Sequence, residues 1–252
     1  MDNKQIIKDV IFKLDKKVFQ NSGSYSRKEK IFLEDRYSQV IDMLPKISKN
    51  NIGLEAGLHS SILAFSLKKI LSLEKLYALE HPTTYRLYTK KHLNKLRENN
   101  IILKPVDLYQ PKYPWPDNFF DFILFSEVME HLIPAYLPHI FAEFNRIIKK
   151  NGYLIVTTPN IASLLKRLNL MSGKNPIEFD LRFHDKGTFG HIREYTMPEL
   201  ISILQNANFK ILETKYYCID SSRNIFTQIE ANTSKFFHSL GNDMMVVATS
   251  QK

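Results

Sequence analysis

The sequence predicts an α/β fold in which a mostly parallel sheet carries helices on both faces. An antiparallel strand closes one edge of this sheet, and a helical extension precedes it. From residue 51 onward, short apolar segments alternate with segments whose apolar residues recur at helical spacing. Residues 119–125 are an almost uninterrupted run of bulky apolar side chains, which is typical of a strand buried on both faces. With 44% hydrophobic residues among 252, the chain can bury a sizeable core.

Residues 1–50 predict a helical cap, separate from a main domain at residues 51–252. Apolar residues between Ile6 and Val18 recur at helical spacing, residues 21–24 interrupt the pattern, and a second helix is expected over residues 27–44. Such a cap can act as a lid over a site, as an arm that makes a homodimer, or as a cover that only packs on the sheet. The sequence leaves these three roles open.

The main domain predicts strands that alternate with helices and then a less regular part. The expected strands are 51–55, 75–80, 101–106, 119–125 and 153–158, and the expected helices are 62–71, 84–99 and 135–150, with a turn at 151–152. Beyond Pro159 we expect a helix over 160–170, a long loop over 172–190 and a helix that Thr196 caps. Residues 209–220 and 243–249 predict the closing antiparallel pair.

Charge and cysteine content narrow the class of protein. The net charge of +9 favours an anionic partner, such as nucleic acid, a nucleotide-linked substrate or an acidic membrane surface. The lysines are spread along the chain, however, which favours ordinary solvated surfaces over a nucleic-acid face. Cys218 is the single cysteine, so no disulfide framework can form within the chain. No apolar run approaches the roughly 20 residues of a membrane span, and we expect a cytoplasmic protein.

Carboxylates follow three successive strands of the predicted sheet. Glu55, Glu80 and Asp107 each stand where a strand ends, and parallel strands bring these ends to one edge. One carboxylate can accept both hydrogen bonds of a ribose diol, and Gly57 allows a ligand to approach the backbone closely. Together these residues predict a site for an adenosine-containing ligand.

From Ile52 to Lys215 the sequence resembles the class I S-adenosylmethionine-dependent methyltransferases, which have a Rossmann-like fold. The segments that carry the resemblance are 54–57, 117–123, 126–132 and 144–155, and 126–132 (SEVMEHL) belongs to the most specific match. The resemblance implies that Glu55 and Gly57 contact the methionine end of the cofactor, that Glu80 holds the ribose, and that Asp107 with Leu108 contacts adenine. It also implies that Ser126 and Glu127 border the cofactor.

The segments 158–160 and 191–196 resemble branches that act on quinone precursors, sugars and glycans, the type 11/12 and ubiquinone-biosynthesis-like O-methyltransferases. This implies O-methylation of a small-molecule or sugar/glycan-type acceptor, with an acceptor-side insertion at about 160–195. Arg182, His184, Asp185 and Arg193 could bind an anionic acceptor, although an ordinary solvated loop explains them as well. The family's first motif usually has two or three glycines, whereas Leu58, His59 and Ser60 follow Gly57 here. A catalytically inactive, methyltransferase-like binding protein is therefore an alternative.

The spacing Glu127-x-x-Glu130-His131 resembles that of two subfamilies that use it for a divalent cation. These are the ubiquinone-biosynthesis O-methyltransferases and the small-RNA 3′-terminal 2′-O-methyltransferases, and His191 resembles a further ligand of the RNA enzymes. A metal, if present, would be held by Glu127, Glu130, His131 and His191, and an RNA 2′-O-methyltransferase is a second alternative. The cation is not favoured. Instead we take Glu130, His131 and His191 as the catalytic candidates, with His131 as general base or the group as a structural brace.

Overall fold

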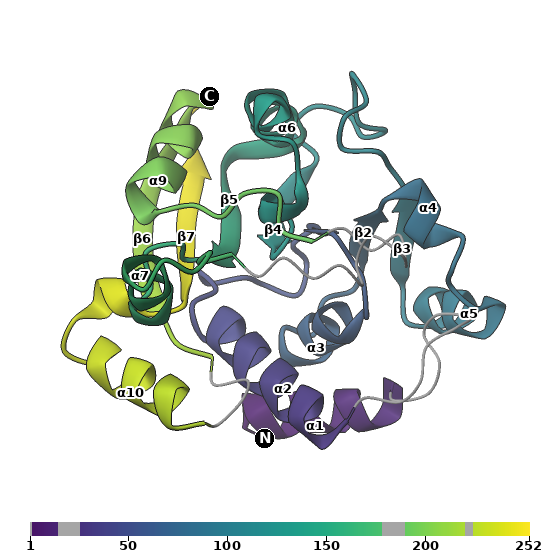
Figure 1. Ribbon diagram of the computed structural model, residues 1–252. Coiled ribbons are helices and arrows are strands. Elements are labelled where there is room, and N and C mark those ends of the chain that lie inside the picture. Colours follow the sequence, from purple (N-terminus) through teal and green to yellow (C-terminus); the bar gives the residue numbers. More distant parts are fainter. Residues whose placement is uncertain (1, 15–25, 178–189, 220–223) are drawn as a thin grey trace.

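The computed structural model describes residues 2–14, 26–177, 190–219 and 224–252, and it confirms the α/β fold. Within these residues one sheet has seven strands in the order β3-β2-β1-β4-β5-β7-β6 (Figure 1). The strands are β1 (Gly53–Ala56), β2 (Leu76–Glu80), β3 (Ile101–Pro105), β4 (Phe120–Ser126), β5 (Ile148–Pro159), β6 (Phe209–Tyr217) and β7 (Asp243–Ser250). Strands β1 to β5 pair in parallel, and β7 runs antiparallel to both of its neighbours.

Strand β4 lies in the middle of the sheet, and its side chains are buried on both faces. Phe122 and Leu124 enter the core on one face, while Ile123 and Phe125 enter the core on the other. All four side chains are fully buried. The alternation of side chains along a strand therefore accounts for the apolar run in the sequence.

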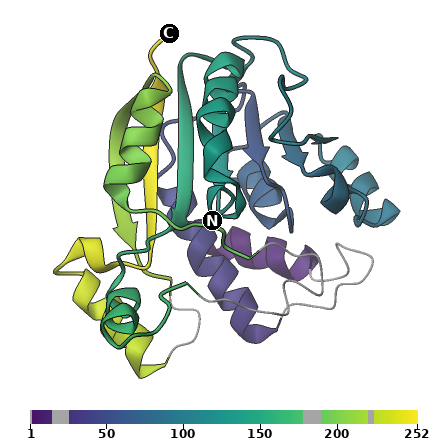
Figure 2. The ribbon, with the colours of Figure 1, turned by 45° about the horizontal axis from the view of Figure 1, so that its top comes forward.

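Helices cover both faces of the sheet (Figures 1 and 2). One face carries α3 (Ile62–Ile70), against which α1 (Asn3–Leu14) and α2 (Arg27–Asp42) are packed, and the other carries α6 (Leu137–Ile147) and α9 (Met197–Asn206). The apolar stripe of α1, formed by Ile7, Val10, Ile11 and Leu14, is buried in the same core as α3. The predicted cap thus covers the sheet of its own chain, and the homodimer stays a prediction.

The prediction of a single helix over 84–99 is wrong, because the chain forms two shorter helices in this region. They are α4 (Pro82–Tyr85) and α5 (Lys90–Glu98), and Thr89 begins the second by accepting a hydrogen bond from the His92 N–H. Tyr88 lies between them, is 3% exposed and donates its hydroxyl to the His59 carbonyl over 2.6 Å. The burial of this ring interrupts the helix at a point that helical spacing alone does not mark.

Two other helix boundaries differ from the prediction. Helix α6 ends at Ile147, because residues 148–150 already belong to β5 and the expected turn at 151–152 is an irregularity within that strand. Asn151 has a φ of +59°, which allows the bulge. Helix α7 (Leu164–Met171) starts four residues later than expected, because Asn160 forms a β-bridge with Tyr195.

The remaining segments complete the picture. The interruption between helices expected at 21–24 and most of the loop expected at 172–190 lie outside the described residues, as do Arg182, His184 and Asp185. Helix α10 (Ile225–Ser234) was not predicted. Short 3₁₀ helices are η1 (Met129–His131), η2 (Pro134–Tyr136) and η3 (His238–Leu240). Within the described residues, no helix is long and apolar enough to cross a membrane.

Candidate active site

The predicted acidic residues do lie together at the carboxyl edge of the sheet. Glu55 is the third residue of β1, Glu80 ends β2 and Asp107 follows β3. Glu55 is 4% exposed, and one of its carboxylate oxygens, Oε2, is buried without a hydrogen-bond partner. Burial, and next the charge of Glu80, raises the pKa of Glu55 well above its usual value. A buried acceptor without a partner is expected where a ligand supplies the donor.

The glycine-poor loop 57–61 is fastened to the end of β2. The two carboxylate oxygens of Glu80 each accept one 2.8 Å hydrogen bond: Oε2 from the backbone N–H of His59 and Oε1 from that of His81. Leu58, the first bulky residue after Gly57, is 2% exposed and turns into the core, away from the edge. The departure from the glycine pattern is therefore accommodated by burying a side chain.

Gly57 itself is required by the geometry of this turn. Its φ is +96°, a conformation that side chains disfavour, and a Cβ built on it would lie 2.4 Å from Cγ2 of Val128. Val128 is the second residue after β4, so the turn after β1 and the turn after β4 are in contact. This contact brings the first motif against the E-x-x-E-H segment.

Asp107 and Leu108 lie at the third strand end as predicted. One carboxylate oxygen of Asp107 accepts the Tyr109 N–H over 2.9 Å, which orients the group. Leu108 is 7% exposed and belongs to the core on the α6 face. Trp115 packs edge-on against Phe120 with ring centroids 5.4 Å apart.

These residues fit S-adenosylmethionine. Each Glu80 oxygen accepts one backbone N–H and keeps lone-pair capacity for the hydroxyls of a ribose diol. The unpartnered Oε2 of Glu55 suits a cationic amino group, and the turn at Gly57 lets a ligand reach the backbone. Glu55, Gly57, Glu80 and Asp107 would therefore hold the cofactor.

Glu127 does not join the other metal candidates. Its φ is +55°, and its carboxylate forms an ion pair with Arg36 of α2 over 3.1 Å and accepts the Thr157 hydroxyl over 2.8 Å. Ser126 continues this chain of hydrogen bonds, since its hydroxyl lies 2.7 Å from that of Thr157. Burial opposes the charge of Arg36, but Glu127 and Asp243 outweigh it and raise the pKa of Arg36 above its usual value.

Sequence reasoning missed Arg36 and Asp243 as parts of this site. Asp243 begins β7, is 5% exposed and has a pKa raised to about 7, chiefly by burial and next by the charge of Glu127. Arg36 lies in the segment predicted as a cap, where no local pattern distinguishes it from other cations. The two residues meet Glu127 only through the tertiary fold.

Glu130, His131 and His191 converge at one point. Each offers a ligand atom within 4.8 Å of the others' ligand atoms, and the two imidazole rings are 4.9 Å apart at an interplanar angle of 73°. The Glu130 side chain is 1% exposed, and its Oε2 accepts the Thr158 hydroxyl over 3.1 Å. The Glu130 carbonyl accepts the Ile192 N–H over 2.8 Å, which ties η1 to the segment that carries His191.

The pKa values of two glutamates in this cluster are shifted in opposite directions. Burial and then repulsion by Glu127 raise the pKa of Glu130 well above its usual value. Burial also acts on Glu194, but hydrogen bonds from His191 and Lys166 outweigh it and hold the pKa of Glu194 below its usual value. The site thus places a carboxyl group with a raised pKa beside His131 and one with a lowered pKa beside His191.

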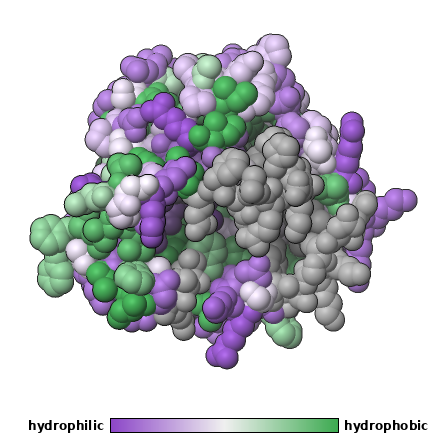
Figure 3. Space-filling view, in the orientation of Figure 1, coloured by the Kyte–Doolittle hydropathy of each residue, from purple (hydrophilic) through white to green (hydrophobic). Residues whose placement is uncertain are grey.

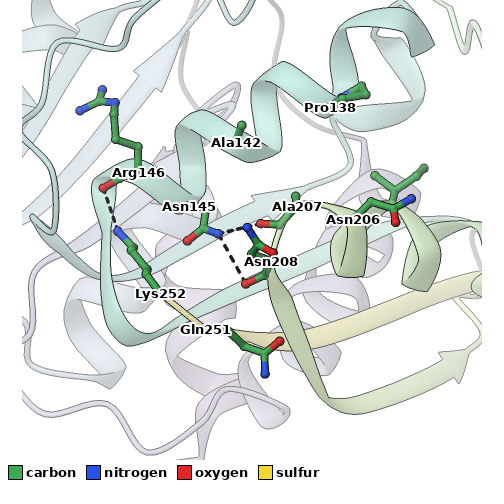
Figure 4. Close-up of a pocket in the computed structure, with 10 residues that line it drawn as sticks. Pro138, Ala142, Asn145, Arg146, Asn206, Ala207, Asn208, Gln251 and Lys252 are labelled. Atoms are coloured by element: carbon green, nitrogen blue, oxygen red, sulfur yellow. Dashed lines mark hydrogen bonds between the residues drawn. The ribbon is translucent and has the colours of Figure 1, made fainter.

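A cavity of about 620 Å³ lies at the opposite, amino edge of the sheet, between α6, α9 and the end of β7 (Figure 4). Its polar groups satisfy one another: Asn145 donates to the Ala207 carbonyl over 2.6 Å, and Lys252 donates to the Arg146 carbonyl over 2.9 Å. None of the strand-end carboxylates lines it, so it lies apart from the candidate site.

A family model described as a methyltransferase domain matches residues 36–214 of the sequence. The chain belongs to this methyltransferase family. It is an S-adenosylmethionine-dependent methyltransferase with the Rossmann-like class I fold, and the match begins at Arg36. Comparison with curated proteins gives no match.

Solved structures similar to this methyltransferase share its fold at low sequence identity. An S-adenosylmethionine-dependent methyltransferase from Archaeoglobus fulgidus is 18% identical with a TM-score of 0.57, covering 86% of this chain and 94% of its own. One from Thermotoga maritima is 18% identical with a TM-score of 0.55 and full coverage of both chains (100%). One from Mesorhizobium loti is 13% identical with a TM-score of 0.55, covering 84% of this chain and 96% of its own.

Proposed function

We propose that this methyltransferase methylates a hydroxyl oxygen of a small-molecule or sugar/glycan-type acceptor. The observation that supports it is the group Glu130, His131 and His191, gathered beside the strand-end carboxylates at the same edge of the sheet. A hydroxyl acceptor must lose a proton during transfer, and this group offers a base to receive it. The cofactor, when bound, supplies a methyl group that is already activated as a sulfonium.

His131 is the proposed general base. Its side chain is one-third exposed, and its Nδ1 lies 3.3 Å from the Gly190 carbonyl, which can only accept a hydrogen bond. A neutral ring that donates from Nδ1 carries its lone pair on Nε2, the atom that would take the hydroxyl proton. His191 packs edge-on against this ring, and the Glu194 carboxylate holds its Nδ1 over 2.8 Å.

The test compares His131→Gln, which keeps hydrogen-bonding atoms and loses the basic nitrogen, with His139→Gln on α6 as the matched control. Methyl transfer from labelled cofactor is followed with phenolic, sugar and oligosaccharide acceptors. We expect His131→Gln to lower kcat about 100-fold or more while the cofactor Kd stays unchanged. An unchanged kcat in His131→Gln would remove the proposed base, and transfer only to amine acceptors would overturn O-methylation.

An RNA 2′-O-methyltransferase with a divalent cation is the second candidate. The observation in its favour is that His191 joins Glu130 and His131 within ligand distance, although Glu127 is paired with Arg36 instead. Carboxylate and imidazole ligands suit a cation that lowers a hydroxyl's pKa. This candidate predicts transfer to a short RNA that EDTA abolishes and Mn²⁺ restores; EDTA-insensitive transfer to a sugar or phenol contradicts it.

A further inference from the structure

Two helices outside the candidate site form a small layer beyond the carboxyl edge of the sheet. Helix α7 follows β5, and α10 follows β6, which runs in the same direction as β5 (Figures 1 and 2). The helices lie side by side, and the Glu230 carboxylate of α10 accepts the Leu165 N–H at the start of α7 over 2.9 Å. This bond fixes how α10 is turned about its own axis.

Helix α10 buries its acidic residue and exposes its large apolar residues. Glu230 is 2% exposed and is the only buried residue of the helix, whereas Ile225, Phe226 and Ile229 are 62%, 63% and 48% exposed. A surface helix of a globular protein normally buries its apolar stripe and exposes its charges. The described parts of the chain therefore leave the large apolar side chains of α10 about half or more exposed.

The neighbouring segments extend this exposed apolar area. Eight of the fourteen large apolar side chains that are exposed in the described residues lie on α7, on α10 or just after α10. We call them the apolar cap surface: Leu168, Leu170, Met171, Ile225, Phe226, Ile229, Phe236 and Phe237. In the space-filling view, hydrophobic residues gather at the lower left, where these helices lie (Figure 3). Concentrated apolar exposure of this kind marks interaction sites, whereas scattered residues do not.

The exposed charges on the described segments that carry the apolar cap surface have one sign. Within the described segments 161–177 and 224–241, every exposed Lys, Arg, Asp or Glu is a cation: Arg167, Lys174 and Lys235. The single acid of these segments, Glu230, is buried. The whole chain has the same tendency, with a net charge of +9. An occupant of this surface must therefore be apolar where it meets the rings and anionic around them.

We infer that the apolar cap surface docks on an anionic lipid bilayer. Exposed Phe, Ile, Leu and Met side chains flanked by Lys and Arg are the composition that places a helix in the headgroup region, with apolar groups inserted and cations on lipid phosphates. A second copy of this chain is a poorer occupant. Two-fold pairing would place this surface against the same surface of a second copy, so the three cations Arg167, Lys174 and Lys235 of one copy would face a patch of the same charge, which disfavours the contact.

Docking in this way would turn the carboxyl edge of the sheet toward the bilayer, because α7 and α10 both extend from that edge. An acceptor anchored in the membrane would then meet the site without leaving the lipid surface. The inference about docking does not rest on the proposed function, since none of the catalytic candidates lies on α7 or α10.

The test is sedimentation of the full chain with vesicles at 0.1 M salt. Vesicles of phosphatidylcholine alone are compared with vesicles containing about one-third phosphatidylglycerol. We expect the parent chain to sediment with the anionic vesicles only. Phe226→Ser/Phe236→Ser should weaken this binding at least tenfold, and Lys235→Gln should weaken it about fivefold. The matched controls are Leu87→Ser and Lys91→Gln, which change exposed residues at the β3 edge and should bind as the parent does.

Circular dichroism and the cofactor Kd confirm that each variant is folded. Binding that is absent, equal on neutral and anionic vesicles, or unchanged in Phe226→Ser/Phe236→Ser would overturn the inference. Analytical ultracentrifugation tests the alternative that a second copy of the chain occupies the surface. If the parent does not bind vesicles but forms a dimer, and the double serine variant is a monomer, the surface is assigned to a second copy instead.

Discussion

Arg36 of α2 and Glu127 after β4 form a 3.1 Å ion pair across 91 residues of sequence, and the Arg36 side chain is only 20% exposed. The pair joins the N-terminal cap to the edge of the sheet where the strand-end carboxylates lie. Asp243 adds a second negative charge near the same cation. Burial alone would lower the pKa of Arg36, but the charges of Glu127 and Asp243 outweigh burial and raise it. One guanidinium therefore balances two acids.

Replacing Arg36 by Met should destabilise the chain. Without the cation, Glu127 and Asp243 would repel each other in a largely buried place, at a cost of about 2–3 kcal/mol in the free energy of unfolding near pH 8. Urea denaturation measures this difference, and Arg27→Met at the exposed start of α2 should change it by less than about 0.5 kcal/mol. The double variant Arg36→Met/Glu127→Gln should recover part of the loss; purely additive effects would mean that the two side chains do not interact.

The raised pKa of Asp243 predicts that the free energy of unfolding depends on pH in a specific way. Its pKa rises from 3.8 to about 7 in the folded chain, so between these values the folded state binds more protons than the unfolded state. The contribution of this group to stability is therefore present below pH 4 and is lost as pH rises through 7. Asp243→Asn should raise the free energy of unfolding at pH 8 by roughly 3 kcal/mol and leave it unchanged at pH 4. Parallel pH profiles for parent and variant would contradict this, and Asp42→Asn, at an exposed position, serves as the control.

Glu55→Gln separates ligand binding from folding. The Oε2 atom of Glu55 has no partner among the described residues, so the fold does not use it, whereas a cationic ligand would favour the ionised carboxylate. We expect the variant to bind S-adenosylmethionine at least tenfold more weakly in calorimetry, since hydrogen bonds to charged groups contribute about 1.5–3 kcal/mol. Its free energy of unfolding should not fall. Glu98→Gln on α5 should behave as the parent, and equal cofactor affinities for all three chains would show that Glu55 does not face the cofactor.

Gly57→Ala tests the contact between the first turn and Val128. The added methyl would lie 2.4 Å from Val128 Cγ2, and the φ of +96° is unfavourable for alanine as well. A loss of about 2 kcal/mol or more in unfolding free energy is expected, together with weaker cofactor binding. Adding Val128→Ala should relieve the steric part only. Full recovery in the double variant would mean that the backbone angle carries no cost.

The sheet and its edge could be predicted because they follow from local patterns. The apolar run at 119–125 and the carboxylates Glu55, Glu80 and Asp107 mark buried strands and their ends, and parallel pairing then brings the ends together. Glu130, His131 and His191 also meet, whereas Glu127, the fourth residue of the set that the resemblance implied, is paired with Arg36. Their roles, the domain boundaries at residues 50 and 51, and the acceptor stay predictions.

What could not be predicted depends on contacts between distant residues. Nothing local distinguishes Arg36 from Arg27, yet only Arg36 meets Glu127. The ring of Tyr88 breaks a helix because it is buried beneath the loop at His59, which helical periodicity does not encode. Helix α10 was not predicted, and none of its apolar side chains is buried in the core, which is the packing that helical periodicity predicts.

The packing of α1 against α3 has a consequence for how this chain could evolve. Four apolar side chains of α1 complete the core beneath α3, and α2 supplies the cation at the sheet edge. The first 50 residues therefore cannot be exchanged between relatives like an independent module. A recombinant with a foreign N-terminal segment would inherit an open core and two unbalanced acids, so insertions and exchanges should be tolerated elsewhere on the molecule before they are tolerated here.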